Sequence, residues 1–182
     1  INFFIFNPFV NNFNNNFTYF INNGKYIQFG DTDIEPLHEE KITIKNIKST
    51  TDKIKLFHKS GFAFYKNNDF HLGITNCFHS IKHKQKDDCS FVFYYKNNLI
   101  LCDGGRYDYN KSDIRSKISH FHVHNCLEIP ELSQEYFNLK YGSGKFETNN
   151  NNEINVNNPL YNKYNITHKR RFNINENEKI LT

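Results

Sequence analysis

The sequence predicts a mainly β fold, and more narrowly an antiparallel β-sandwich. The first observation is a series of short segments of alternating, β-branched or aromatic residues that begins at about residue 53. The second is that turn residues separate these segments, as in Lys96-Asn97-Asn98 and Gly104-Gly105. Many short strands joined by tight turns favour two packed antiparallel sheets over a parallel sheet, in which helices would alternate with strands.

The N-terminal segment has a different texture. Its phenylalanines recur every three or four residues between Phe6 and Phe20, which predicts a helix within residues 1–22. Pro8 suits the first turn of such a helix. Asn23-Gly24 predicts a turn, and the charged residues 34–52 are expected to connect this region to the sandwich.

Six segments are predicted to be strands: residues 55–58, 61–66, 70–75, 90–95, 99–102 and 121–129. Residues 142–162, which contain Gly, Asn and Pro, predict a long exposed loop. Residues 179–182 end the chain on a strand-like alternation, while residues 1–6 begin it with an apolar run, and there is no Met. Both ends are therefore expected to be cuts within a longer protein.

The net charge of +4 is mild, and Lys is mixed with acidic residues along the chain. This pattern is typical of a solvated surface, so it does not call for nucleic acid, although an acidic polymer of another kind is compatible with it. No run of 18 apolar residues is present, so no membrane span is predicted.

The cysteines are Cys77, Cys89, Cys102 and Cys126, and none forms a C-x-x-C pair. Buried free thiols are the expected state. A disulfide between Cys89 and Cys102 is the alternative, and it requires the two side chains to face each other across neighbouring strands.

Three polar clusters are candidates for chemistry: residues 79–88, 103–109 and 120–125. In the third, His120, His122 and His124 would share one face of the predicted strand, because side chains repeat every two residues. Two interpretations of this row stay open. It is either a zinc site, continued by Cys126, or a set of half-exposed histidines that face water.

The order of these motifs resembles the heparinase II/III-like family of polysaccharide lyases. Residues 58–66 resemble the strand pair that opens the family's C-terminal domain, and residues 83–91 are similar to its H-x-H-x-D-x-x-S-F signature. Residues 103–109 resemble its D-x-G-x-Y-x-Y element, and His124-Asn125 matches its H-N pair. Each motif is weak alone, but four in this order are specific.

The resemblance implies an α/α toroid followed by an antiparallel β-sandwich. Residues 1–40 are then expected to hold the last helix of the toroid and a linker, and residues 41–182 a sandwich truncated at its C-terminus. Family members cleave uronic-acid-containing polysaccharides of glycosaminoglycan, alginate or capsule type by β-elimination. An acidic polysaccharide is thus the expected partner. The toroid supplies further catalytic residues, so this chain alone is expected to be inactive.

The family's location is usually periplasmic or secreted, and the same is expected here. Four cysteines without an evident pairing are less typical of an oxidising compartment.

His83 is implied as a catalytic residue by its place in the signature, where it would help to neutralise the uronate or transfer a proton. A surface histidine is the alternative. Arg106 and Tyr107 follow the Gly-Gly turn after Asp103 and are candidate contacts for an acidic sugar, since Arg binds carboxylate or sulfate with two hydrogen bonds. A surface Arg without a partner is the commoner outcome.

The family's zinc ligands correspond to Gln85, Asp103 and His124. Gln85 departs from the pattern, because it stands where the family has a second His, and a neutral amide oxygen is a poor zinc ligand. The resemblance thus implies a weak or empty zinc site, for which His122 is a substitute ligand without support in the family pattern. Without metal, Gln85 is expected to donate to Asp103 and accept from His124. In either state the cluster would brace the loop of His83.

Two other function classes stay open. A binding or scaffold protein that kept the sandwich and lost catalysis is suggested by Gln85. A zinc-dependent hydrolase is suggested by the row His120, His122 and His124.

Overall fold

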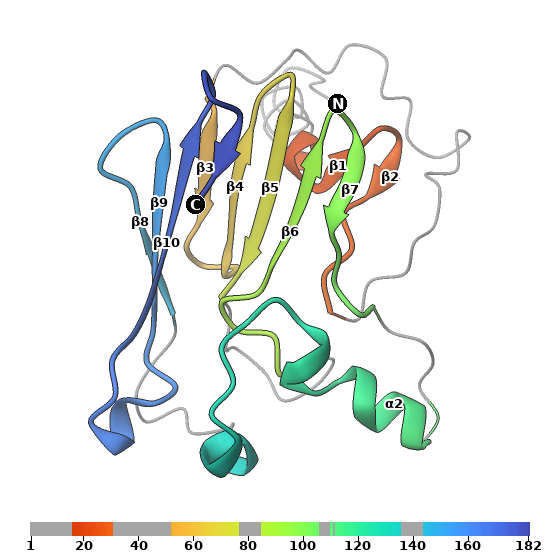
Figure 1. The fold of residues 1–182 in the computed structure, drawn as a ribbon, viewed down its shortest axis with the longest axis vertical. Coiled ribbons are helices and arrows are strands. Elements are labelled where there is room, and N and C mark those ends of the chain that lie inside the picture. The colour runs from red at the N-terminus through yellow and green to blue at the C-terminus, as the bar shows by residue number, and fades with distance from the viewer. Residues whose placement is uncertain (1–15, 31–51, 77–84, 106–109, 111, 136–143) are drawn as a thin grey trace, which may run out of the picture.

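The computed structural model of the protein describes residues 16–30, 52–76, 85–105, 110, 112–135 and 144–182. Within them, two antiparallel sheets pack face to face (Figure 1). One has the order β3 (Ile54–Phe57), β4 (Phe62–Lys66), β5 (Phe70–Thr75), β6 (Phe91–Tyr95) and β7 (Asn98–Leu101). The other has the order β11 (Ile180–Leu181), β10 (His168–Asn175), β9 (Glu153–Asn158) and β8 (Lys145–Glu147). The predicted antiparallel β-sandwich is confirmed.

The main core lies between the two sheets. Successive side chains of a strand point to opposite faces, so every second residue is buried. The five-stranded sheet contributes Ala63, Tyr65, Phe70, Leu72, Ile74, Phe91 and Phe93, and the four-stranded sheet contributes Phe146, Ile154, Val156, Phe172 and Ile174. Each large apolar side chain buried in this way contributes about 1.5–3 kcal/mol, which makes this layer the main source of stability.

The outer face of the five-stranded sheet is covered by the N-terminal described segment. This segment contains η1 (Thr18–Phe20) and a hairpin of β1 (Ile21–Asn22) and β2 (Lys25–Tyr26). The hairpin turn is the predicted Asn23-Gly24, with φ of 47° and 72°, values that favour these two residue types. A second core forms here from Tyr19, Ile27, Phe29, Phe64 and Val92. The central strands β4 and β5 are therefore buried on both faces.

Gly73 makes this second core possible. It lies on β5 opposite Phe64 of β4. A Cβ atom at this position would lie 2.5 Å from Cζ of Phe29 and 3.2 Å from Cε1 of Phe64. The absent side chain leaves the space that the Phe29 ring occupies.

Five of the six predicted strands are present, with ends shifted by one residue at most. The turn between β6 and β7 is Lys96-Asn97, with φ of 48° and 63°, as a two-residue hairpin requires. Residues 1–15 of the predicted N-terminal helix lie outside the described residues. Residues 18–20 of it form the 3-10 helix η1.

The predicted strand at residues 121–129 is wrong. The chain forms α2 (Asp113–Ile118) and the 3-10 helix η2 (Phe121–Val123), and a further 3-10 helix, η3 (Pro130–Glu135), follows. Phe121 packs into a small cluster of its own with Cys126 and Leu160, and the backbone N–H of Asn125 donates to the Ser90 side chain. No sheet edge supplies the backbone partners that a strand would need here.

The predicted exposed loop at residues 142–162 is also wrong, because it contains β8 and β9. β10 follows the 3-10 helix η5 (Asn162–Tyr164) and was not predicted. In β9 and β10 the inward residues alternate with Asn, Lys and Arg, and an inward Arg170 interrupts the apolar pattern. No helix in the described part of the chain is long and apolar enough to cross a membrane.

Candidate functional site

The candidate site lies at one end of the five-stranded sheet. In an antiparallel sheet the end of one strand lies beside the start of the next. The chain that leaves β5, the chain that enters β6 and the chain that leaves β7 therefore meet at the same edge, above α2 in Figure 1. Residues 85–90, 102–105 and 124–125 are brought together there.

Asp103 is the centre of this cluster. Its Oδ1 accepts hydrogen bonds from the backbone N–H groups of Gly30, at 3.0 Å, and Gly105, at 3.1 Å. Its Oδ2 lies 2.8 Å from Nδ1 of His124, and both side chains are fully buried. Three donors thus hold one carboxylate, which fixes the end of β7, residue 124 and the N-terminal segment relative to one another.

His124 presents its second ring nitrogen to the interior. A carboxylate only accepts hydrogen bonds, so Nδ1 carries the proton that Asp103 receives. Nε2 is buried and has no hydrogen-bond partner among the described residues. A buried, unpaired nitrogen beside a carboxylate-oriented Nδ1–H is the arrangement of a histidine that binds a ligand through Nε2.

Gln85 is buried beside this pair. Its Nε2 donates to the carbonyl oxygen of Gly105 at 3.0 Å, which joins the segment before β6 to the segment after β7. The expected bonds from Gln85 to Asp103 and from His124 to Gln85 are therefore not the ones that form, and His124 donates directly to Asp103 instead.

The same residues can be tested as a zinc site. Both oxygens of Asp103 already accept hydrogen bonds from three groups. Gln85 offers zinc only a neutral amide oxygen, and only His124 brings an imidazole with an available nitrogen. One imidazole, one engaged carboxylate and one amide fit zinc poorly, since structural and catalytic zinc sites use mainly Cys, His and anionic carboxylate ligands.

Asn125 fastens the strand ends to the cluster. Its Nδ2 donates to the carbonyl oxygen of Phe91, at 2.9 Å, and to that of Cys102, at 2.8 Å. Its backbone N–H donates to Oγ of Ser90 at 3.1 Å. The side chain joins Phe91 and Cys102, which lie just beyond the last paired residues of β6 and β7, Phe93 and Leu101.

Arg170 of β10 supports the cluster from the second sheet. Its Nη1 donates to the carbonyl oxygen of Cys89 at 3.0 Å and also to that of Asn125. The guanidinium carbon lies 4.6 Å from the ring centroid of Phe91 and 5.3 Å from that of Phe172. No sequence pattern indicates this role, because an inward arginine on a strand is recognised only once the two sheets are packed.

Cys89, Cys102 and Cys126 are free thiols. Burial, with Asp88 beside it, raises the pKa of Cys89 well above its usual range. Burial, with Asp87 beside it, raises the pKa of Cys126 to about 12. Both remain protonated at neutral pH, and a protonated thiol is neither a good nucleophile nor a metal ligand. Cys77 lies outside the described residues.

The other predicted site residues are placed as follows. His83, Arg106 and Tyr107 lie outside the described residues; His83 precedes Gln85 by two residues, and Arg106 directly follows Gly105. His120, His122 and His124 do not form the predicted row, because η2 interrupts any strand and His124 alone reaches Asp103. Asn125 and Ser90 lie within the recognised motifs but were given no role, and Arg170 was not predicted to belong to the site.

Comparison with solved structures supports the fold. A heparinase III with methylated lysines has a TM-score of 0.67 and 20% identity, covering 86% of this chain and 28% of that one. Another heparinase III has a TM-score of 0.65 and 16% identity, covering 94% and 33%. The heparan sulfate lyase HepC from Pedobacter heparinus has a TM-score of 0.63 and 16% identity, covering 81% and 27%. The chain thus spans about a third or less of the length of these structures.

No curated protein matches the chain. A family model described as "Heparinase II/III-like, C-terminal" matches residues 49–182, which is well over half of the chain and includes every strand of the sandwich except the N-terminal hairpin. The sheet order, the cluster at the strand ends and this match agree, and the chain belongs to the heparinase II/III-like family, as part of its C-terminal region.

Proposed function

We propose that this chain is the C-terminal part of a polysaccharide lyase that cleaves a uronic-acid-containing acidic polysaccharide by β-elimination. The observation that carries the proposal is the buried pair of Asp103 and His124, which holds residues 85–90, 102–105 and 124–125 at one end of the sheet. Family membership supports the reaction class. The chain's share of the related structures makes the activity a property of a longer protein.

β-Elimination sets three requirements. The carboxylate of the uronate must be neutralised so that the adjacent carbon can lose its proton. A base must reach that proton, and an acid must reach the departing glycosidic oxygen. Histidine suits the last two tasks because its pKa is near neutrality.

His83 is the residue to which we assign proton transfer or uronate neutralisation. His83 precedes the buried Gln85 by two residues in the sequence. The Gln85–Gly105 hydrogen bond likewise ties the base of the segment that carries Arg106 and Tyr107 to the same place. These three residues are therefore assigned to one acidic-sugar site, with Arg106 and Tyr107 as substrate contacts.

The cluster of Gln85, Asp103 and His124 is assigned a bracing role. Its hydrogen bonds join residues 85, 103, 105 and 124, which are next to the segments that contain His83 and Arg106 in the sequence. A brace of this kind acts on catalysis through the position of other residues.

The substrate class is an acidic polysaccharide, and a glycosaminoglycan is our first choice because one similar structure is described as a heparan sulfate lyase. Alginate and capsule polymers are alternatives within the same chemistry. A periplasmic or secreted location is proposed with this substrate, since such polymers occur outside the cytoplasm.

The test uses the full-length protein that contains this chain. It is incubated with heparan sulfate, other glycosaminoglycans, alginate and capsular polymers, and the ultraviolet absorbance of the unsaturated uronate is followed. His83→Ala is expected to lower kcat about 10²–10⁴-fold, as loss of a general acid–base residue does. His58→Ala is the matched control, because His58 is exposed in the turn between β3 and β4.

Two outcomes would contradict the proposal. Absence of product from every acidic polymer, with binding retained, would favour a binding protein that has lost catalysis. Full activity of the His83 variant would refute the role given to that residue.

A further inference from the structure

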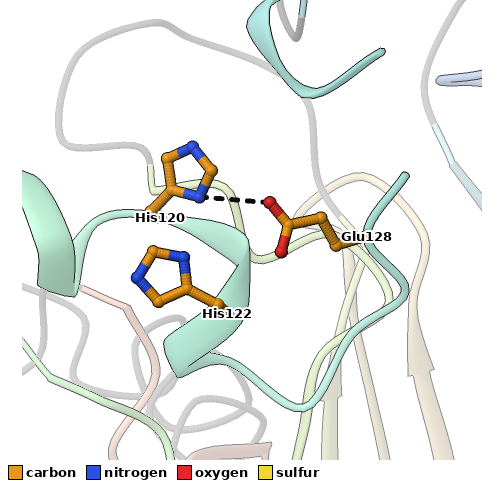
Figure 2. A group of neighbouring side chains, drawn as sticks. All are labelled: His120, His122 and Glu128. Atoms are coloured by element: carbon orange, nitrogen blue, oxygen red, sulfur yellow. Dashed lines mark ion pairs between the residues drawn. The ribbon is translucent and has the colours of Figure 1, made fainter. Parts of the chain in front are cut away.

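A second group of side chains lies beside the site but is not part of it. His120, His122 and Glu128 each place one potential ligand atom within 4.8 Å of the others. Nδ1 of His120 is 3.4 Å from Oε1 of Glu128. Figure 2 shows the two imidazole rings one above the other and the carboxylate beside them. No other such group is found among the described residues.

Local packing explains why these three residues meet. Phe121, the first residue of η2, is buried and turns inward, so its neighbours His120 and His122 turn outward on the same side. Their ring centroids are 4.9 Å apart and the ring planes differ by 32°. Cys126, which follows η2, packs against Phe121, and Sγ lies 3.6 Å from the carbonyl oxygen of Phe121.

We propose that His120, His122 and Glu128 bind a divalent transition-metal ion, for which zinc is the best match. Two imidazoles and one carboxylate form a ligand set that zinc uses in proteins. This site differs from Gln85, Asp103 and His124, where only one imidazole is available.

The distances fit such an ion. With metal–ligand bonds of about 2.05 Å, two ligands of a tetrahedral zinc lie about 3.4 Å apart. His120 and Glu128 already have this separation, at 3.4 Å. The distances from the His122 ligand atom to those of His120 and Glu128 are at most 4.8 Å, so each must shorten by at most about 1.4 Å when the ion binds. The His122 side chain is exposed, so it can make this movement without disturbing the core.

The surroundings of the His120 ring also support a metal ion at this place. Its Nδ1 is buried, and although the Glu128 carboxylate is near, no hydrogen bond to it forms among the described residues. An ion between the two groups would supply the missing contact. The competing cation is Lys86, whose charge interacts with both Glu128 and His120 and whose Nζ lies 5.7 Å from the centroid of Phe121.

An ion at this place would have three protein ligands and one position open to solvent, because His122 is exposed. It would join η2 to the segment that follows Asn125. The ion would thereby stiffen the stretch that carries His124 and Asn125, and the open position is available to water or to an anionic oxygen.

The test measures zinc binding by the full-length protein after treatment with a chelator, using equilibrium dialysis and metal analysis. We compare the wild type with His122→Ala, Glu128→Gln and the control His58→Ala. The wild type and the control are expected to bind one zinc more than the first two variants. Loss of a direct ligand should weaken binding at this site at least about 100-fold, since loss of an outer residue already costs 10- to 100-fold.

A second readout separates a metal site from a folding defect. Zinc should raise the melting temperature of the wild type and of His58→Ala, and have no such effect on His122→Ala, whose melting temperature without metal should equal that of the wild type. Cobalt(II) should give the visible spectrum of tetrahedral coordination only where His122 is present. Equal zinc affinity in the wild type and His122→Ala, or no zinc bound by the wild type, would overturn the proposal.

Discussion

His71, on β5, and His124, near one end of the five-stranded sheet, are both buried. The surroundings of their ring nitrogens differ. In His71, Nε2 lies 2.9 Å from the carbonyl oxygen of Tyr19, and Nδ1 lies 3.3 Å from the side-chain amide of Asn22. In His124, Nδ1 contacts Asp103 and Nε2 has no partner among the described residues. His71 therefore has an oxygen beside each ring nitrogen, whereas His124 has one beside Nδ1 only.

The two histidines mark two regions with different hydrogen bonding. Around His71, Lys66 also donates to the carbonyl oxygens of Thr18 and Ile21, at 2.6 and 2.7 Å, so that the N-terminal segment is fastened to the sheet. Around His124, a buried nitrogen without a partner costs about 1–3 kcal/mol, a cost that native proteins retain mainly at functional sites. The two regions are connected, because the same N-terminal segment ends at Gly30, whose N–H reaches Asp103.

The largest effect is expected from Asp103→Ala. The change leaves the N–H groups of Gly30 and Gly105 and Nδ1 of His124 without their acceptor. We expect the free energy of unfolding to fall by roughly 3–5 kcal/mol, because three buried donors lose their acceptor at a cost of about 1–3 kcal/mol each. Urea denaturation measures it. Asp113→Ala, at an exposed position in the first turn of α2, is the control; a loss below about 1 kcal/mol at position 103 would show that the cluster is not a brace.

Gly73→Ala tests the other region. The added Cβ would lie 2.5 Å from Cζ of Phe29, so the ring must move. We expect a loss of about 1–3 kcal/mol, typical of an overfilled core. Thermal unfolding measures it, and Phe29→Leu in the same chain should recover part of the loss. If Gly73→Ala is neutral, the N-terminal segment is not fastened as tightly as the contacts of His71 and Lys66 indicate.

The pH dependence of stability sharpens the comparison. Burial, with Lys66 beside it, lowers the pKa of His71 to about 3 in the folded protein. The unfolded chain, with a pKa near 6.5, then binds more protons below neutrality, so stability falls as the pH drops through 6.5 and toward 3. The loss from this one group is about 2 kcal/mol at pH 5.

Urea denaturation between pH 7.5 and 5 measures this loss. His71→Gln keeps a polar side chain and should show a smaller fall in stability over that range. An identical pH profile for the variant would contradict the assignment of a neutral His71.

The smallest effect is expected from Ser112→Ala, which lies far from both histidines along the sequence. Oγ of Ser112 accepts from the N–H of Arg115 at 3.1 Å and caps the six-residue helix α2. Loss of an exposed cap costs about 0.5–1 kcal/mol. Thermal unfolding gives this baseline against which the buried changes are compared. A larger loss would mean that α2 supports the neighbouring η2 more strongly than its exposure indicates.

Some contacts of the candidate site could be predicted from the sequence, and others could not. The resemblance to the heparinase II/III-like family implied the proximity of Asp103 and His124, and the structure places Nδ1 of His124 2.8 Å from Oδ2 of Asp103. The contact from Gly30 was not predicted, because it joins positions 73 residues apart through a backbone N–H that has no sequence signal. The roles of Arg170 and Asn125 were missed for the same reason. The hydrogen-bond partners of these polar side chains are distant in the sequence, so they can be identified only in the folded structure.

Some strands, too, could be predicted from the sequence, and others could not. The sequence by itself determined the β class, the positions of β3 to β7 and the turns at Asn23-Gly24 and Lys96-Asn97, because alternation and positive φ are local properties. Only the tertiary structure decided that β8 to β10 are strands and that residues 121–123 form a 3-10 helix. Asn-, Lys- and Arg-rich strands have one apolar face at most, and they are stable only when a second sheet covers that face.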